Sequence, residues 1–317
     1  MLGLSSSICG PLKRPGEQGS ERRKGVPNPI KSVTIAARDS YLVGTTMFPA
    51  TTETALARLI VAGATGVPQQ FYRRFAQYAA DKGFEVWTMD YRGVGLSKPP
   101  SLRGFKADFL DWGGLDLAAV VDHLTHRSDA PIVMVGHSFG GHALGLLPNA
   151  NRIAGLVTFA TGAGWHGWMP PLERIRVLLL WFVFGPIVVR CKGYLAWSAF
   201  GMGEDLPKEL FYQWRHWCRL PHYFFDDPNM DYLKRQFSAI KIPILAINAT
   251  DDRWAPPTSR DAFMKAYRNA FLESVTISPE DYGLSSIGHM GYFRAQATPI
   301  WEGVIDWLTK KVVQRSS

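Results

Sequence analysis

The chain has 317 residues, of which 46% are hydrophobic and 20% are charged, and its formal net charge is +8. This length suffices for a large hydrophobic core, and the composition excludes a disordered, collagen-like or repeat-built protein. Three cysteines cannot form a disulfide framework, so the chain fits a reducing compartment and we expect a cytoplasmic location.

The N-terminal stretch, residues 1–30, is expected to be a flexible basic leader because proline, glycine and serine are frequent in it. Residues 1–31 hold six basic and two acidic side chains, so they account for half of the net charge. The other half is spread over the remaining chain without an aromatic-interleaved basic motif, which argues against nucleic-acid binding. The first residues lack the basic region and the apolar run of a secretory signal.

From residue 32 onward, strand-like and helix-like segments alternate along the chain. Short apolar runs predict strands, and apolar residues at helical spacing predict helices. The expected strands are Ser32–Ala36, Tyr41–Phe48, Leu59–Ala62, Phe84–Met89, Ile132–Val135, Ile153–Phe159, Ile242–Ile247 and Ser274–Ile277. The expected helices are Phe71–Lys82, Asp111–His126, Phe139–Leu147, Ser259–Ala270 and Thr298–Val313. This alternation predicts an α/β fold with a mostly parallel central sheet flanked by helices.

Residues 162–230 interrupt this alternation. They are expected to be helical, and they contain six of the eleven tryptophans. We interpret them as a helical, Trp-rich cap inserted into a core made of residues 31–161 and 231–317, lying over the C-terminal edge of the sheet where such folds bind ligands. The longest apolar run, Val177–Val189, is shorter than the roughly 18 residues that a membrane span needs, so we expect a buried or interfacial helix there.

The strongest motif is Gly136-His137-Ser138-Phe139-Gly140, which follows an expected strand and opens an expected helix. A strand that turns sharply into a helix strains the backbone of the middle residue and exposes its hydroxyl at the edge of the sheet. The flanking glycines keep neighbouring backbone from clashing, and the helix start is the positive end of its dipole. The motif therefore predicts Ser138 as a nucleophile.

A serine nucleophile needs a general base, and the base needs a carboxylate to orient it. His289 lies in a Gly-flanked loop between the last expected strand and the last expected helix, which makes it the predicted base. Two adjacent carboxylates, Asp251 and Asp252, follow the strand at 242–247. We favour Asp252 as the orienting acid and keep Asp251 as the alternative.

Two backbone N–H groups are needed to bind the oxyanion of such a reaction. One belongs to the residue after the nucleophile, Phe139, and the other comes from the loop after the third strand. That loop is the Gly-rich stretch 63–66, in which we expect Ala64 to be the donor.

Taken together, these motifs resemble those of α/β-hydrolase-fold serine hydrolases over about residues 32–313. The resemblance is closest to the lysophospholipase-like and serine aminopeptidase-like branch of predicted hydrolases, and it implies an α/β-hydrolase fold with an inserted helical cap. One departure is Ala62-Gly63, where many relatives carry His-Gly, although the backbone donor survives this change. The matching stretches are Gly136–Gly141, Asp90–Ser97, Asp252 with Pro256 four residues later, and Gly288-His289.

We therefore expect a serine hydrolase that cleaves a carboxylic ester, or else a thioester or an amide, of a small-molecule substrate. No HExxH motif and no cysteine–histidine cluster at metal spacing is present, and we expect neither a metal nor a cofactor. The aromatic cap favours an apolar pocket for an acyl chain or a ring. The expected pocket residues are Trp165, Trp168, Trp254 and Met290.

Three alternatives stay open from the sequence. The same triad could transfer the acyl group to an alcohol or an amine instead of water. A ligand-binding receptor on a hydrolase scaffold is a second alternative, although such proteins often lose a triad residue. The third is action at a membrane or micelle interface, which is suggested by the apolar run Val177–Val189.

Overall fold

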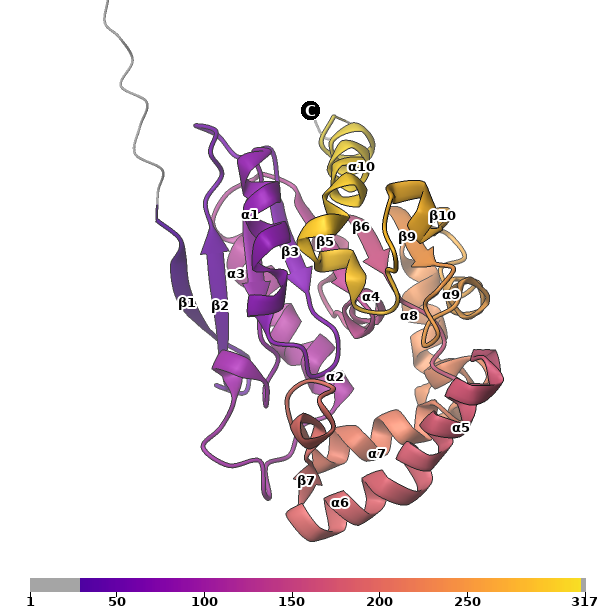
Figure 1. The fold of residues 1–317 in the computed structure, drawn as a ribbon. Coiled ribbons are helices and arrows are strands. Elements are labelled where there is room, and N and C mark those ends of the chain that lie inside the picture. The colour runs from indigo at the N-terminus through magenta and orange to yellow at the C-terminus, as the bar shows by residue number, and fades with distance from the viewer. Residues whose placement is uncertain (1–28, 315–317) are drawn as a thin grey trace, which may run out of the picture.

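The computed structural model describes residues 29–314, so the expected leader lies outside the described residues except for its last two. An eight-stranded sheet forms the centre of the molecule (Figure 1). Strand β2 is antiparallel to both of its neighbours, and the other adjacent pairs are parallel. In spatial order the strands are β1 (Lys31–Ala36), β2 (Leu42–Phe48), β4 (Glu85–Met89), β3 (Arg58–Ala62), β5 (Ile132–His137), β6 (Ile153–Phe159), β9 (Pro243–Ala249) and β10 (Phe271–Ile277).

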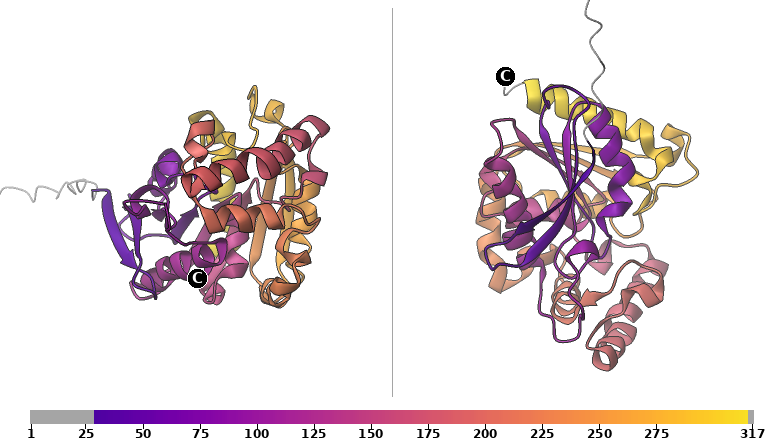
Figure 2. Two further views of the ribbon diagram at one scale, coloured as in Figure 1. Left: turned by 90° about the horizontal axis from the view of Figure 1, so that it is seen from below. Right: turned by 90° about the vertical axis from the view of Figure 1, so that its left-hand side faces the viewer.

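Helices cover both faces of the sheet, as expected for strands that are apolar along their whole length. On one face, α1 (Arg73–Asp81) and α10 (Thr298–Leu308) bury their apolar sides in a shared cluster. On the other face lie α3 (Ala118–Thr125), α8 (Asp231–Ala239) and α9 (Pro257–Met264). Figure 2 shows this layered arrangement from two further directions.

The sequence predicts the strands well and the helix ends less well. The expected helix at 111–126 is one run that begins with α2 (Phe109–Asp111), passes through a π-helix (Trp112–Leu117) and ends with α3. The expected helix at 139–147 is α4 (Phe139–His142) followed by a 3₁₀ turn (Ala143–Leu146). The expected helix at 259–270 ends at Met264, because turns after it lead the chain into β10.

Residues 162–230, which we call the cap, lie outside the central sheet. Seen from below, the cap helices lie in front of the sheet (Figure 2, left). In Figure 1, α7 lies closer to the sheet than α6 does. The cap contains α5 (Pro171–Leu179), a π-helix (Leu180–Phe184), α6 (Gly185–Lys192), α7 (Lys208–Trp217) and a small ribbon of β7 (Tyr194–Leu195) and β8 (Leu206–Pro207).

Tryptophan rings hold the cap together and join it to the core. The rings of Trp181 and Trp214 meet edge to face at 4.7 Å, and Trp197 lies 5.7 Å from Trp214. On the core side of α7, Trp217 stacks 5.8 Å from Phe109 of α2. Among residues 29–314, no helix is long and apolar enough to cross a bilayer.

A buried ion-pair network fixes the loop after β4 against the rest of the core. Arg92 donates to the fully buried carboxylate of Asp116 through both its backbone N–H and its guanidinium, at 2.8 Å each. The Arg92 guanidinium also pairs with the carboxylate of Asp39, at 2.6 Å. Burial by itself lowers the pKa of Arg92, but the hydrogen bonds to Asp39 and Asp116 outweigh burial and raise it. The guanidinium therefore stays charged.

We predict that Arg92→Ala lowers the free energy of unfolding by about 3–5 kcal/mol, because it leaves the Asp116 carboxylate buried without a counter-charge. Denaturant-induced unfolding at pH 7 measures this change. The matched control is Arg38→Ala, which removes an exposed ion pair with Asp122 at 3.6 Å and should cost less than about 1 kcal/mol. Equal effects of the two substitutions would contradict the prediction.

Candidate active site

Ser138 lies at the turn between β5 and α4 in a strained backbone conformation, with φ 52° and ψ −111°. Glycines allow this turn. A Cβ on Gly136 would meet the backbone of Gly140 and Gly141 at 2.5 Å, and a Cβ on Gly140 would collide with the carbonyl oxygen of Ala62. The Ser138 N–H donates to the carbonyl of Phe159 in β6 at 2.8 Å, which fixes the turn to the sheet.

The structure brings the three sequence-predicted side chains into one hydrogen-bonded row. The Ser138 hydroxyl donates to Nε2 of His289 at 3.0 Å. On the other side of the ring, Nδ1–H of His289 donates to both oxygens of Asp252, at 3.0 and 3.1 Å. The carboxylate is fully buried, the imidazole is 21% exposed, and Ser138 is half-buried. This arrangement can transfer a proton away from the serine hydroxyl.

The two adjacent aspartates have different partners. Asp252 faces the imidazole and also accepts hydrogen bonds from the N–H groups of Trp254 and Ala255, at 2.9 Å each. Asp251 does not contact the imidazole. Instead it accepts hydrogen bonds from the backbone N–H groups of Ile287 and Gly288, at 2.9 Å each, and so it holds the loop that carries His289. Of the two alternatives from the sequence, the structure brings Asp252 to the imidazole.

Electrostatics keep the Asp252 carboxylate ionised. Burial by itself raises its pKa, but the charge and the hydrogen bond of His289, together with the two backbone N–H donors, outweigh burial. The net result is a pKa below the ordinary value of 3.8. An ionised carboxylate at this place stabilises the imidazolium that forms when the histidine takes a proton.

Of the two expected oxyanion donors, Phe139 is the first residue of α4, where a helix N–H has no acceptor within the helix. Ala64 differs from the expectation, because its N–H already donates to the hydroxyl of Tyr72 at 2.8 Å. The N–H of the next residue, Thr65, donates to no acceptor among the described residues. The loop 63–66 is therefore where we expected it, but the expected amide is engaged.

Sequence reasoning missed a second buried row of hydrogen bonds beside the first. The Tyr72 hydroxyl lies 2.9 Å from Nδ1 of His137, and Nε2 of His137 lies 2.8 Å from the carbonyl oxygen of His289. Burial lowers the pKa of His137 to about 3, so the ring is neutral. Its Nε2–H donates to that carbonyl, and the hydroxyl donates to Nδ1. Only three-dimensional proximity reveals this row, since 65 residues separate Tyr72 from His137.

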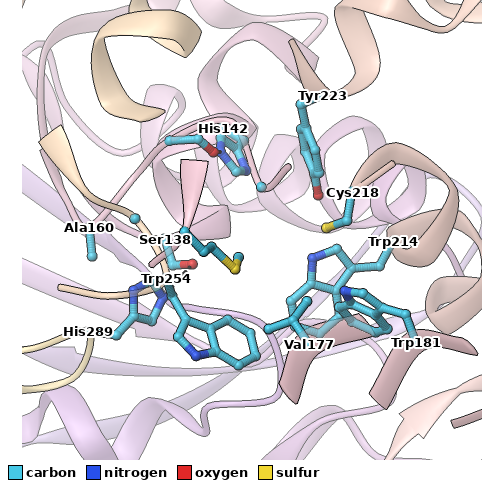
Figure 3. A pocket seen from close by; sticks show the side chains of 14 residues that line it. Ser138, His142, Ala160, Val177, Trp181, Trp214, Cys218, Tyr223, Trp254 and His289 are labelled. Atoms are coloured by element: carbon cyan, nitrogen blue, oxygen red, sulfur yellow. Dashed lines mark hydrogen bonds between the residues drawn. The ribbon is translucent and has the colours of Figure 1, made fainter. Parts of the chain in front are cut away.

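Two cavities meet at the nucleophile. A small one of about 40 Å³ extends from Ser138 into the cap, and Figure 3 shows Ser138 and His289 on one side of it and Trp181 and Trp214 on the other. A larger one of about 700 Å³ lies along the loop 64–71. Both cavities are lined by Ser138, Trp214, Trp254 and His289.

The expected pocket residues are only partly in place. Trp254 lines both cavities and Met290 lines the larger one. Trp165 and Trp168 line neither, which corrects the expectation. Their rings meet each other at 5.6 Å, and the Trp168 N–H donates to the carbonyl of Pro221, so the pair packs within the cap. The cap instead supplies Trp181 and Trp214 to the small cavity and Trp197 and Trp214 to the large one.

Trp254 also joins the cap to the core. Its indole N–H donates to Oε1 of Glu173 on α5 at 2.9 Å, and its ring centroid lies 6.0 Å from that of His289. Among residues 29–314, no three histidine, cysteine, aspartate or glutamate side chains are grouped so that they could hold a metal ion.

Comparison with known proteins places this geometry in a wider context. The profile of the family described as "Alpha/beta hydrolase family" matches residues 59–297, three quarters of the chain. No curated protein matches the chain in sequence.

Several solved structures are similar in fold. The esterase domain of a Rhodothermus marinus protein is 15% identical, with a TM-score of 0.57 over 90% of this chain and 100% of that one. A soluble variant of monoglyceride lipase from Saccharomyces cerevisiae, bound to a substrate analog, is 15% identical, with a TM-score of 0.63 over 94% and 99%. A thermophilic esterase from Thermogutta terrifontis is 17% identical, with a TM-score of 0.54 over 89% and 99%. At these identities the similarity shows the fold.

We predict that Asp252→Asn lowers the free energy of unfolding by about 1–3 kcal/mol at pH 7, because a buried hydrogen-bonded charge is lost. The pKa of Asp252 is lower in the folded protein than in the unfolded chain. The stability it contributes is therefore fully present above pH 3.8 and is lost as the pH falls through the folded-state value.

The measurement is denaturant unfolding of both proteins between pH 3 and pH 7, and their difference should shrink only in the acidic part of that range. Asp306→Asn, at an exposed ion pair with Lys310, is the control and should change stability by less than about 1 kcal/mol throughout. A difference that grows on acidification would refute the prediction.

Proposed function

The chain belongs to the alpha/beta hydrolase family, and on that premise we propose that it is a serine hydrolase that cleaves a carboxylic ester, or else a thioester or an amide, through an acyl-enzyme. The observation that carries this proposal is the hydrogen-bonded row of Ser138, His289 and Asp252 at the junction of two cavities. The esterases and the lipase among the structural neighbours support it at the level of hydrolase chemistry.

In the proposed reaction, the Ser138 Oγ attacks the carbonyl carbon while Nε2 of His289 accepts the hydroxyl proton. Asp252 stabilises the imidazolium that forms. The tetrahedral intermediate collapses when its bond to the leaving group breaks, and His289 gives its proton to the leaving atom. A water molecule then gives a proton to the same histidine and attacks the acyl carbon. The bond from that carbon to the Ser138 Oγ breaks, the histidine returns the proton to Oγ, and the carboxylic acid is released.

The oxyanion needs two N–H donors near the attacked carbonyl. We propose Phe139 as the first, since its N–H lies directly after the nucleophile at the start of α4. The second comes from the loop of Ala64 and Thr65, both of which line the large cavity beside Ser138. Ala64 can serve only if its N–H leaves the Tyr72 hydroxyl, whereas the N–H of Thr65 has no protein acceptor among the described residues.

The unequal cavities suggest what the substrate looks like. The small cavity has room for a group of only a few heavy atoms, since about 10–15 Å³ of such space accommodates one water molecule. The large cavity, with walls that include Phe71, Trp197 and Met290, has room for a long chain or a ring system. We therefore propose an ester with one small substituent and one large apolar substituent.

We predict that Ser138→Ala abolishes hydrolysis of p-nitrophenyl esters, because loss of a catalytic serine typically costs about 10⁶-fold in turnover. A fluorophosphonate probe should label the native protein and not the variant. Ser101→Ala, at an exposed serine, is the matched control and should leave both readouts unchanged. A native protein that neither reacts with the probe nor hydrolyses any ester would favour a ligand-binding role.

Product analysis with added alcohols or amines separates hydrolysis from acyl transfer. We expect the free acid to be the main product at every acceptor concentration. If the main product were instead the acyl group joined to the added alcohol or amine, the proposed reaction would be acyl transfer by the same triad and not hydrolysis.

We predict that methyl octanoate is hydrolysed at least about tenfold faster than octyl octanoate, measured as kcat/KM, because only one long substituent can be accommodated. Val177 lines the small cavity and also a neighbouring groove. Val177→Ala should therefore lower the ratio of kcat/KM for methyl octanoate to that for octyl octanoate, and Val177→Ile should raise it. The ratio of the two substrates within one preparation cancels differences in active fraction. An unchanged ratio in both variants would show that the small cavity does not receive the substrate.

A further inference from the structure

The outer side of α5, of α6 and of the π-helix between them carries an apolar surface that no described residue covers. Seven of the seventeen exposed large hydrophobic side chains of the described chain lie between residues 172 and 187, and we call them the outer cap face. They are Leu172, Ile175, Leu179, Phe182, Val183, Phe184 and Ile187. Figure 1 shows these two helices at the border of the molecule.

The opposite side of the same helices is buried in the cap. Val177, Leu180, Trp181 and Val189 are each less than a tenth exposed, whereas Ile187 on the outer side is 57% exposed. The stretch is thus apolar on both sides. A helix that is apolar all round is normally enclosed, so its exposed side indicates a surface that another apolar medium covers.

Positive charge surrounds the outer cap face. Residues 171–192 carry four basic side chains, Arg174, Arg176, Arg190 and Lys192, all exposed. Their only acidic residue is Glu173, which is mostly buried, hydrogen-bonded to Trp254 and paired with Arg176 at 3.4 Å, so three of the four basic side chains have no acidic partner within this stretch. Arg215 of the neighbouring α7 and Arg219 of the turn after it approach the ring of Phe182 at 5.8 and 5.9 Å. This charge is complementary to an anionic surface.

The outer cap face is also continuous with the way into the candidate site. Phe184 belongs to it and lines a groove together with Met202 and Trp254. Met202 and Trp254 in turn line the large cavity that contains Ser138. An apolar molecule on the outer cap face would therefore meet apolar walls along its path to the nucleophile.

We propose that the outer cap face docks onto the surface of an anionic lipid bilayer, with α5 and α6 lying in the interface. Apolar side chains along one side of a helical stretch, flanked by arginine and lysine, are what such an interface binds: the apolar groups enter the acyl region and the cations pair with lipid headgroups. Delivery of an amphiphilic ester from that surface rests on the proposed function, whereas docking itself does not.

The test is flotation of the full-length chain with vesicles of phosphatidylcholine alone and of phosphatidylcholine with phosphatidylglycerol. We expect binding to the mixed vesicles, weaker binding to the neutral ones, and a reduced difference in 0.5 M salt. The Ser138→Ala protein should float like the native one, so binding is measured independently of catalysis. No flotation of the native chain with either vesicle would overturn the proposal.

Two variants locate the contact. Phe182→Asp with Ile187→Asp should weaken binding to the mixed vesicles by about tenfold or more, because two large side chains can no longer enter the apolar region. Arg190→Glu with Lys192→Glu should remove the preference for the anionic vesicles. The control is Phe271→Asp with Val275→Asp on the edge strand β10, where the side chains are 65% and 40% exposed. This control should bind like the native chain.

Thermal unfolding and hydrolysis of a short soluble ester report whether each variant is folded, and neither Phe182 nor Ile187 lines a cavity of the site. A folded Phe182/Ile187 variant that binds vesicles as well as the native chain would overturn the proposal. Analytical sedimentation without lipid tests the alternative that a second copy of this chain covers the outer cap face. The proposal would also be overturned if the native chain formed a stable dimer and did not bind vesicles, and if only the Phe182/Ile187 variant were monomeric.

Discussion

The candidate site depends on how closely the turn after β5 approaches β3. Gly140 lies against the carbonyl oxygen of Ala62, and any side chain there would force the two apart. This contact, together with the close approach of Gly136 to Gly140 and Gly141, lets α4 begin directly after β5 with Ser138 at φ 52°. The sheet supplies the rigid frame for this strained residue, since the Ser138 N–H is held by the neighbouring strand β6.

The sequence predicts those parts of the molecule that local rules control. Strands β5 and β9 are covered on both faces, so they read as continuous apolar runs, and the candidate catalytic residues follow directly at their ends. The direction of the cap side chains follows no such rule. The π-helix at 180–184 shifts the helical phase, and so a 3.6-residue period cannot show where Trp181 points. Trp165 precedes the first cap helix and Trp214 lies in the regular helix α7, so contacts between segments decide their directions.

Contacts between distant segments account for the remaining differences. Asp251 and Asp252 are chemically identical neighbours. Only the fold of the loop that carries His289 decides that Asp251 binds the backbone of this loop and that Asp252 binds the imidazole. Tyr72 similarly engages the Ala64 amide across a turn of the chain. The buried Tyr72 thereby holds the loop 63–66 in place.

Trp254 has a consequence for how such a protein could acquire new substrates. One indole contacts the cap through Glu173, forms a wall of both cavities and follows directly on the turn that holds Asp252. The cap lies outside the central sheet, so its residues could in principle change while the sheet and its turns stay the same. In this chain that independence is limited. A change in α5 would move Trp254, whose indole contacts Glu173 and whose backbone N–H contacts Asp252, and it would also change the shape of both cavities. Diversification should proceed more readily at the ribbon and at α7 than at the helix that carries Glu173.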